Sequence, residues 1–375
     1  MVADEGRLPP LAKPLLKSSP ETAGFKDGWK PSDVKVAMNI TLDASFVPAT
    51  ANALDLSSMP GAPRGCRASV SRVVALDNLI DDEALEYIRY SYLGSELDTG
   101  DAPSGYRWER RTADDDEAKP TWGLKQFHMD HLVKTITHGG TSLEHLGSSS
   151  LSGPFKEFHS RLQALYPDWI ICHMPADALV APEGETVKDD DEHTEKYRCE
   201  SFVANAAVFG DEYRWHVDAD PSSFPDGCEW VKTYGDYVNG EPGKPLFVSA
   251  IIYPNETWQE GEWGAETHFT DKDSGVGAMV APRPGRVVLM DQDVTHRVSP
   301  PSRAAGERAR YSLVYKLVFF PRNGNGNANA ELWERGIARP EWGVPSPIGS
   351  AAKLAAIVNA AARRAGGVKR EREDE

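Results

Sequence analysis

Two histidines and one aspartate in this sequence have the residue types and the spacing of a site for a divalent metal ion. His216 and Asp218 stand two residues apart, so on a β-strand both side chains leave the same face. An imidazole and a carboxylate held side by side can chelate a divalent cation, and His296, 78 residues beyond Asp218, is the candidate for the third ligand. A metal held on one face by these three groups keeps open positions on its other face.

A single His-x-Asp pattern is weak support for a metal, because a core histidine also bonds a neighbouring carboxylate for structural reasons alone. His128 and Asp130 form a second such pair, which lies outside the strand-rich part of the chain. The pair at His216 gains weight from Arg310, which follows His296 by fourteen residues at the start of an apolar run. An arginine that faces the interior of a sheet is costly to bury unless it meets an anion.

The chemistry of Arg310 suits a carboxylate. Its planar guanidinium matches the distal carboxylate of 2-oxoglutarate, and Ser312, on the same strand face, could add a hydroxyl donor. Arg308 is the alternative for this role. The non-functional alternative for Arg310 is a surface salt bridge. Two histidines and one carboxylate with open positions form the facial triad of non-haem Fe(II) oxygenases.

These residues must be positioned by a strand-rich segment. From Phe202 onward about eight short apolar runs are separated by Pro and Gly turns, a pattern typical of a jelly roll or a barrel. We therefore predict a fold that is mostly β with flanking helices (α+β), around a double-stranded β-helix (jelly-roll, cupin-like) core. Upstream, we predict a strand at Val73–Leu76, a helix from Asp81 or Asp82 to Tyr90, a polar loop over Asp98–Lys119 and a helix over Leu151–Tyr166. The later strands are expected at Phe202–Phe209, Trp215–Val217, Leu246–Tyr253, Thr267–Phe269, Gly277–Val280, Arg286–Met290, His296–Val298 and Tyr311–Phe320.

The order of several motifs resembles the Fe(II)/2-oxoglutarate-dependent dioxygenase superfamily, and within it the prolyl-4-hydroxylase-like group. The resemblance covers about residues 71–322. It departs from the group where Gly264–Thr267 reads GAET instead of GGET, and where Arg310 stands in place of the lysine usual in collagen-type enzymes. The motifs that carry it are Val73–Glu83, His216–Asp218, Ile251–Asn255, Gly264–Phe269, Arg283–Met290, His296 and Arg310–Leu313.

The resemblance implies a site and a reaction. By it, Fe(II) is bound by His216, Asp218 and His296, and 2-oxoglutarate by Arg310, with Ser312 and Asn205 as further co-substrate candidates. 2-Oxoglutarate is then decarboxylated to succinate, with O₂ as oxidant and ascorbate as a reductant. The substrate is a small molecule or a peptidyl side chain, of which a C–H bond is hydroxylated or otherwise oxidised.

Candidates for contact with the substrate flank the His-x-Asp pair. Arg214 and Asp220 share its strand face, and Trp258 lies near the expected mouth of the site. Instead of contacting substrate, Arg214 and Asp220 could form a salt bridge or support the strand ends, and Trp258 could pack within its loop. Trp215 is expected on the opposite face, in the core. Three other functions stay open: an AlkB-like nucleic-acid demethylase, a zinc-dependent cupin-like hydrolase or isomerase, and a catalytically inactive jelly-roll binding protein.

Composition narrows the partners and the compartment. The net charge of −16 over 375 residues argues against a protein that coats a polyanion, and against nucleic acid as partner. No run approaches the roughly 18 apolar residues of a membrane helix, and Met1–Lys30 lacks the apolar region of a secretory signal. The four cysteines are dispersed without a CxxC pair. We therefore expect an intracellular, cytoplasmic protein in a reducing environment.

The composition also changes along the chain. Residues 1–70 are predicted to be an irregular lead-in with a short strand at Val34–Leu42. Residues 71–322 are expected to form the dioxygenase domain, with its jelly-roll core at about 200–322. Residues 323–375 are expected to hold a linker, a helix at Ala351–Ala365 and a charged tail.

Overall fold

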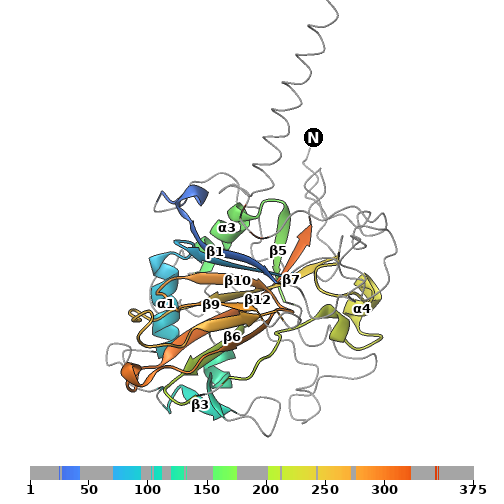
Figure 1. The fold of residues 1–375 in the computed structure, drawn as a ribbon. Helices are drawn as coiled ribbons and strands as arrows, with labels where there is room; N and C mark the ends of the chain where they lie inside the picture. Colours follow the sequence, from blue (N-terminus) through green and yellow to red (C-terminus); the bar gives the residue numbers. More distant parts are fainter. Residues whose placement is uncertain are drawn as a thin grey trace, which may run out of the picture.

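The fold consists of two antiparallel sheets, one nine-stranded and one three-stranded (Figure 1). The computed structural model describes residues 25, 28–42, 71–93, 103, 105–111, 120–130, 132, 155–174, 202–211, 213–241, 244–271, 276–321, 343 and 345. The large sheet has the strand order β1-β2-β10-β7-β12-β6-β4-β3, and β5 pairs with the second half of β12. Its strands are β1 (Lys35–Leu42), β2 (Ser71–Asp77), β3 (Trp108–Arg111), β4 (Thr121–Leu124), β5 (Trp169–His173), β6 (Phe202–Ala207), β7 (Leu246–Ile252), β10 (Val287–Asp291) and β12 (Arg310–Pro321).

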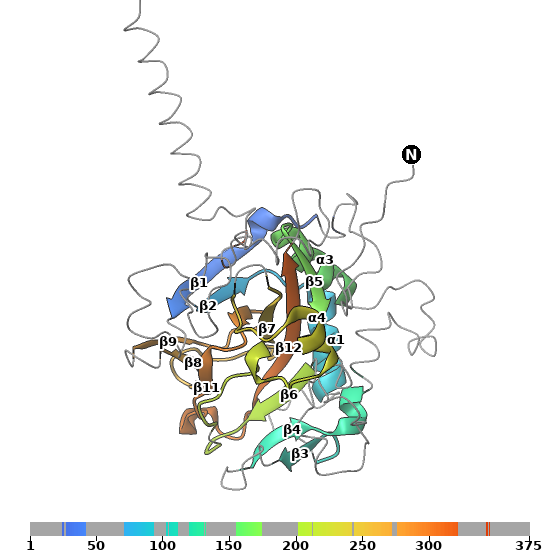
Figure 2. The same ribbon diagram turned by 90° about the vertical axis from the view of Figure 1, so that its right-hand side faces the viewer.

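The small sheet has the order β11-β8-β9 and consists of β8 (Thr267–Thr270), β9 (Gly277–Val280) and β11 (Thr295–Val298). Figure 2 shows these strands on one side of the large sheet and α1 (Asp82–Leu93) on the other. A mostly β fold with flanking helices, as the sequence predicts, is thereby confirmed. None of the helices within the described residues is long and apolar enough to cross a membrane.

Helix α1 begins where the sequence predicts. Asp81 caps it, because its Oδ1 accepts a hydrogen bond of 2.8 Å from the backbone N–H of Ala84. Ala84, Leu85 and Ile88 are buried at helical spacing and join the core under the large sheet. The cap and the apolar stripe together fix both the start of the helix and the face that it turns to the sheet.

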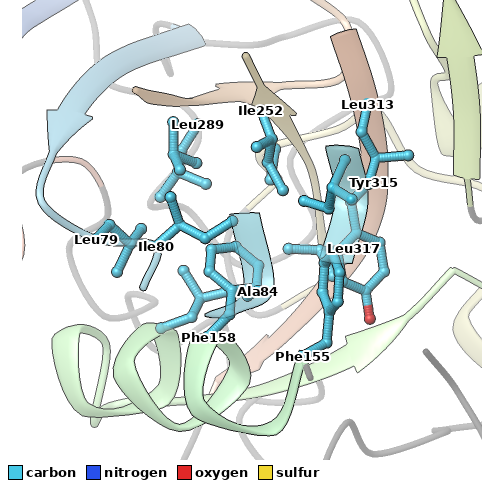
Figure 3. Close-up of a cluster of buried hydrophobic side chains, with 14 of the residues drawn as sticks. Leu79, Ile80, Ala84, Phe155, Phe158, Ile252, Leu289, Leu313, Tyr315 and Leu317 are labelled. Carbon is cyan, nitrogen blue, oxygen red and sulfur yellow. The ribbon is translucent and has the colours of Figure 1, made fainter. Parts of the chain in front are cut away.

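Helix α3 (Phe155–Leu165) covers the same face of the large sheet. Its buried apolar residues, Phe155, Phe158, Leu162 and Leu165, are three or four positions apart and so lie on one side of the helix. Figure 3 shows Phe155 and Phe158 directed at leucine, isoleucine and tyrosine side chains of the strands. Burying each such side chain contributes about 1.5–3 kcal/mol, so this face of the sheet is the principal core.

Strand β12 separates that core from the opposite face. It pairs with β7 along one edge, for example Lys316 with Ser249, and with β6 along the other, for example Ser312 with Asn205. Because side chains alternate along a strand, one set faces the helices and the other faces the small sheet. Tyr311, Leu313, Tyr315, Leu317 and Phe319 belong to the core beneath the helices, whereas Arg310, Ser312, Val314 and Lys316 face the small sheet.

The structure corrects three sequence predictions. Strand β3 lies within Asp98–Lys119, which was expected to be a polar loop, because Trp108 anchors it in the core and it pairs with β4. The expected strand at Trp215–Val217 is a single bridge between His216 and His296. Trp215, expected in the core, is 43% exposed, because it lies on the outer side of the small sheet.

Three elements were not predicted at all: β4, β5 and α4 (Glu229–Tyr234). Strand β1 lies before residue 71, the predicted start of the domain, but it belongs to the large sheet because it pairs with β2 along its length. The predicted helix at Ala351–Ala365 lies outside the described residues.

Candidate functional site

The structure brings His216, Asp218 and His296 together between the two sheets. One potential ligand atom from each residue lies within 4.8 Å of the others. The backbones of His216 and His296 form an antiparallel bridge, with N–H···O distances of 3.0 and 2.9 Å, and their ring centroids are 4.3 Å apart. Asp218 is held by its own N–H, which donates to the carbonyl of Gln292 at 2.8 Å. Two segments distant in the sequence therefore supply one compact set of nitrogen and oxygen donors.

Hydrogen bonds fix the direction in which each donor points. The Nδ1 atoms of His216 and His296 lie 2.9 Å from the carbonyl oxygens of Arg214 and Val294, respectively. An Nδ1–H that donates to a carbonyl leaves Nε2 as the lone-pair atom, available to a metal. Ser249 Oγ donates to Asp218 Oδ2 at 2.5 Å, which leaves Oδ1 directed at the histidines.

The electrostatics favour the protonation states that bind metal. Burial is the main reason that the pKa of His296 is lowered to about 4; Asp218 acts in the opposite direction, and the neighbouring His216 contributes to the lowering. Burial by itself would raise the pKa of Asp218, but Lys316, His296 and the Ser249 hydrogen bond outweigh it, and the pKa lies below its usual value. His296 is therefore neutral and Asp218 ionised at neutral pH, as ligation of a divalent cation requires. His216 is exposed, so the cluster opens to solvent on that side.

Arg310 lies on the same side of the large sheet and is 1% exposed. Its Nη1 donates to Ser312 Oγ at 2.8 Å and its Nη2 to Thr267 Oγ1 at 2.9 Å. The guanidinium carbon lies 4.8 Å from the ring centroid of Tyr253, whose hydroxyl is 2.8 Å from Thr267 Oγ1. Nε of Arg310 is buried, and within the part of the chain that the structure describes it has no hydrogen-bond partner. All these partners are neutral, so the guanidinium is a buried cation that an anionic ligand would complete.

Arg308, the alternative to Arg310, lies elsewhere. Its guanidinium stacks over Trp263 at 4.9 Å and donates to the carbonyl of Ala305. Of the two arginines, only Arg310 shares the space between the sheets with the His–Asp–His cluster. Asn205 stands across from Ser312 in the β6–β12 register, as its assignment to the co-substrate region requires.

Sequence reasoning missed the roles of Thr267 and Tyr253. Both lie in quoted motifs, Thr267 in the GAET turn and Tyr253 before Pro254, but nothing in the spacing of either residue reveals a contact with Arg310. The available signal is strand alternation: Thr267 and Phe269 share the inner face of β8, and Phe269 stacks with His296 at 6.3 Å.

The remaining substrate candidates have structural contacts. Asp220 accepts hydrogen bonds from the backbone N–H groups of Ser222 and Asn239, and so caps a short 3₁₀ turn. Trp258 is buried, packs edge-on against Trp263 and donates to the carbonyl of Gly264. Arg214 is exposed next to His216.

The other sequence candidates for a metal lie apart from the cluster. His128 makes edge-on contacts with the exposed rings of Tyr106 and Phe127. His268 lies on the outer face of the small sheet, 6.5 Å from Trp215. Within the described residues, the only set of three potential ligands that converge is His216, Asp218 and His296.

Comparison with known families agrees with this geometry. Residues 202–315, which include all three clustered residues and Arg310, match the model of the 2OG-Fe(II) oxygenase superfamily. No curated protein matches the chain.

Several solved structures to which the chain is similar are prolyl hydroxylases. A Pseudomonas putida prolyl-4-hydroxylase is 27% identical over 33% of this chain and 54% of its own, with a TM-score of 0.20. The match thus spans about half of that enzyme. A Trichoplax adhaerens prolyl hydroxylase, in complex with a hypoxia-inducible-factor peptide fragment, is 11% identical over 66% of this chain and 83% of its own, with a TM-score of 0.34. A viral collagen prolyl hydroxylase from Paramecium Bursaria Chlorella virus-1 is 10% identical over 66% of this chain and 89% of its own, with a TM-score of 0.27.

Proposed function

Because residues 202–315 match the model of the 2OG-Fe(II) oxygenase superfamily, we propose that the chain is an oxygenase of this superfamily that hydroxylates, or otherwise oxidises, a C–H bond of a small molecule or a peptidyl side chain. In this proposal His216, Asp218 and His296 hold Fe(II), and Arg310 holds the distal carboxylate of 2-oxoglutarate. Fe(II) with 2-oxoglutarate supplies the activation of O₂. Ascorbate serves as a reductant that maintains the ferrous ion.

The residues present fit both groups. Two imidazoles and one carboxylate, each oriented by a backbone or side-chain hydrogen bond, are the donor set that non-haem Fe(II) takes. After the bonds of the buried Arg310 to Ser312 and Thr267, its Nε is still without a partner among the described residues. A carboxylate would neutralise the guanidinium and use that donor.

Each of these residues has a definite task. Arg310 and Tyr253 orient the co-substrate, and Ser249 keeps the Asp218 carboxylate in position. His216 and His296 present Nε2 while their Nδ1 protons stay bound to carbonyls. The apolar residues beside the cluster, among them Phe269 and Val314, exclude water from its inner side.

The observation that carries the proposal is the buried, incompletely bonded Arg310 on the same side of the large sheet as the His–Asp–His cluster. An inactive binding module or a zinc hydrolase has no use for a buried guanidinium in this place. We also propose a reducing intracellular compartment, which suits a ferrous ion and the buried cysteines Cys172 and Cys228.

Succinate formation from 2-oxoglutarate tests the proposal. The assay uses Fe(II) and ascorbate, a panel of small-molecule and peptide substrates, and the wild type with His216→Ala, Arg310→Ala and Arg308→Ala. We expect His216→Ala to lose iron binding and turnover. Arg310→Ala should raise the apparent KM for 2-oxoglutarate by more than about 30-fold, since breaking a buried charge pair costs about 2 kcal/mol or more.

Arg308→Ala is the matched control and should leave this KM unchanged. The absence of both iron binding and succinate formation in the wild type, even uncoupled from substrate, would refute the proposal. A rise in KM in Arg308→Ala, with none in Arg310→Ala, would move the co-substrate site to the other arginine.

A further inference from the structure

Lys316 is a second cation on the face of β12 that carries Arg310. Arg310, Ser312, Val314 and Lys316 alternate along this face toward the small sheet, and Lys316 stands directly across from Ser249 in the β7–β12 register. Ser249 is the residue that donates to the Asp218 carboxylate. The register therefore places the Lys316 side chain at the level of the metal-binding cluster.

The ammonium of Lys316 acts on the cluster without being paired to it. Its positive charge reaches both Asp218 and His296 and lowers the pKa of each. Yet the Lys316 ammonium makes no hydrogen bond, and no ion pair within 4.0 Å, in the part of the chain that the structure describes. The side chain is half-buried, so its ammonium remains reachable by a ligand.

The two cations serve different parts of the space between the sheets. The guanidinium of Arg310 contacts Ser312, Thr267 and Tyr253, so it lies near the Ser312 level of the strand. The cluster lies near the Lys316 level, four residues or about 13 Å further along the strand. A co-substrate that reaches from Arg310 to the cluster occupies the interval before Lys316. Lys316 is then left for a group that arrives from beyond the cluster.

Charge balance indicates the kind of group. Fe(II), 2-oxoglutarate, Arg310 and Asp218 together carry no net charge. The charge of Lys316 is left over in a half-buried site, where an unpaired charge is costly. On the basis of the proposed function, we propose that Lys316 binds an anionic group of the substrate, so that the enzyme selects a substrate bearing a carboxylate close to the C–H bond that it oxidises.

A binding experiment on the full chain tests this without turnover. Mn(II) replaces Fe(II), and N-oxalylglycine, an unreactive isostere of 2-oxoglutarate, saturates the co-substrate site. Isothermal titration calorimetry then compares paired probes, the free acids and the primary amides of N-acetylated amino acids and dipeptides. The variants are Lys316→Gln, the conservative Lys316→Arg and, as a control, Lys232→Gln on the exposed side of α4.

We expect the wild type to bind one or more acids more tightly than the matching amides. Lys316→Gln should weaken the acids by about tenfold or more, the effect of one charge-assisted hydrogen bond, and leave the amides unchanged. Lys316→Arg and Lys232→Gln should keep the preference for acids. A merely structural role of Lys316 would not separate an acid from its amide.

Two results would overturn the inference. One is that the wild type binds no acid better than its amide. The other is that Lys316→Gln weakens N-oxalylglycine instead of the acids, which would assign Lys316 to the co-substrate. Failure of the proposed function gives a different result, because Mn(II) and N-oxalylglycine would then not bind to the wild type or would bind independently of Arg310.

Discussion

Ser249→Ala removes a single hydroxyl from a fully buried position beside the metal-binding cluster. Ser249 is 0% exposed, and its Oγ donates to Asp218 Oδ2 at 2.5 Å. The substitution alters no charge, and β7 keeps its backbone pairing to β10 and β12 on both sides. What changes is the support of one carboxylate: Asp218 loses the group that both orients it and favours its ionised form.

The expected loss follows from the kind of bond. A hydrogen bond to a charged group contributes about 1.5–3 kcal/mol, and partners of metal-binding side chains typically change metal affinity by about 10–100-fold. Lys316 and His296 still favour the ionised carboxylate in the variant. We therefore expect affinity for Mn(II) or Fe(II) to fall within that range, and the binding of 2-oxoglutarate at Arg310 to change much less.

Anaerobic calorimetry with Mn(II) measures this effect, and thermal unfolding shows whether the variant is folded. Ser223→Ala is the matched control, because its hydroxyl also donates to an oxygen close to the site, the carbonyl of Asp220, but is exposed and does not touch the cluster. If Ser249→Ala folds normally and binds Mn(II) within twofold of the wild type, Asp218 is not held in place by this hydrogen bond and the description of the site is wrong at that point.

Two further predictions concern the co-substrate pocket and the core. Thr267→Val removes the acceptor of Arg310 Nη2 and the partner of the Tyr253 hydroxyl. It should weaken the binding of N-oxalylglycine by about tenfold and leave Mn(II) binding constant. An unchanged affinity for N-oxalylglycine in calorimetry would show that Thr267 does not position the guanidinium. His159, 2% exposed, has a pKa well below its usual value because of burial and of the nearby His173. As the pH falls below about 6.5 the unfolded chain takes up the proton first, so the free energy of unfolding should fall by about 1.4 kcal/mol per pH unit. Urea titrations should show this contribution in the wild type and not in His159→Phe, and equal pH slopes in the two proteins would contradict it.

The sequence predicted best those features whose residues are close together in the chain. His216 and Asp218 are two residues apart, and strand geometry alone puts their side chains on one face. His296 and Arg310 were predicted from their chemistry and from the order of motifs; the structure groups His296 with that pair and buries Arg310 on the same side of the large sheet. Helix α1 was predictable for the same reason, because its cap and its apolar stripe lie within eight residues, Asp81 to Ile88.

The misses are contacts that sequence spacing does not encode. The partner of Thr267 is 43 positions away, at Arg310. Strand β3 contains Glu109, Arg110 and Arg111, which look like a solvated loop, but it is held by one buried tryptophan and by pairing with β4. Trp215 was expected to be buried because of its residue type, yet it lies on an outer sheet face beneath the guanidinium of Arg297, at 4.7 Å.

The register of β12 ties the site to the core. Moving this strand by one residue would exchange Arg310, Ser312 and Lys316 for Tyr311, Leu313 and Leu317 on the face toward the small sheet. The core residues oppose such a slip, because the aromatic and leucine side chains of the other face are buried under α1 and α3. The apolar face of the strand thus determines where its charged side chains lie. Substitutions such as Leu313→Ala, although they touch neither metal nor co-substrate, therefore act on the site by loosening the register that places both cations.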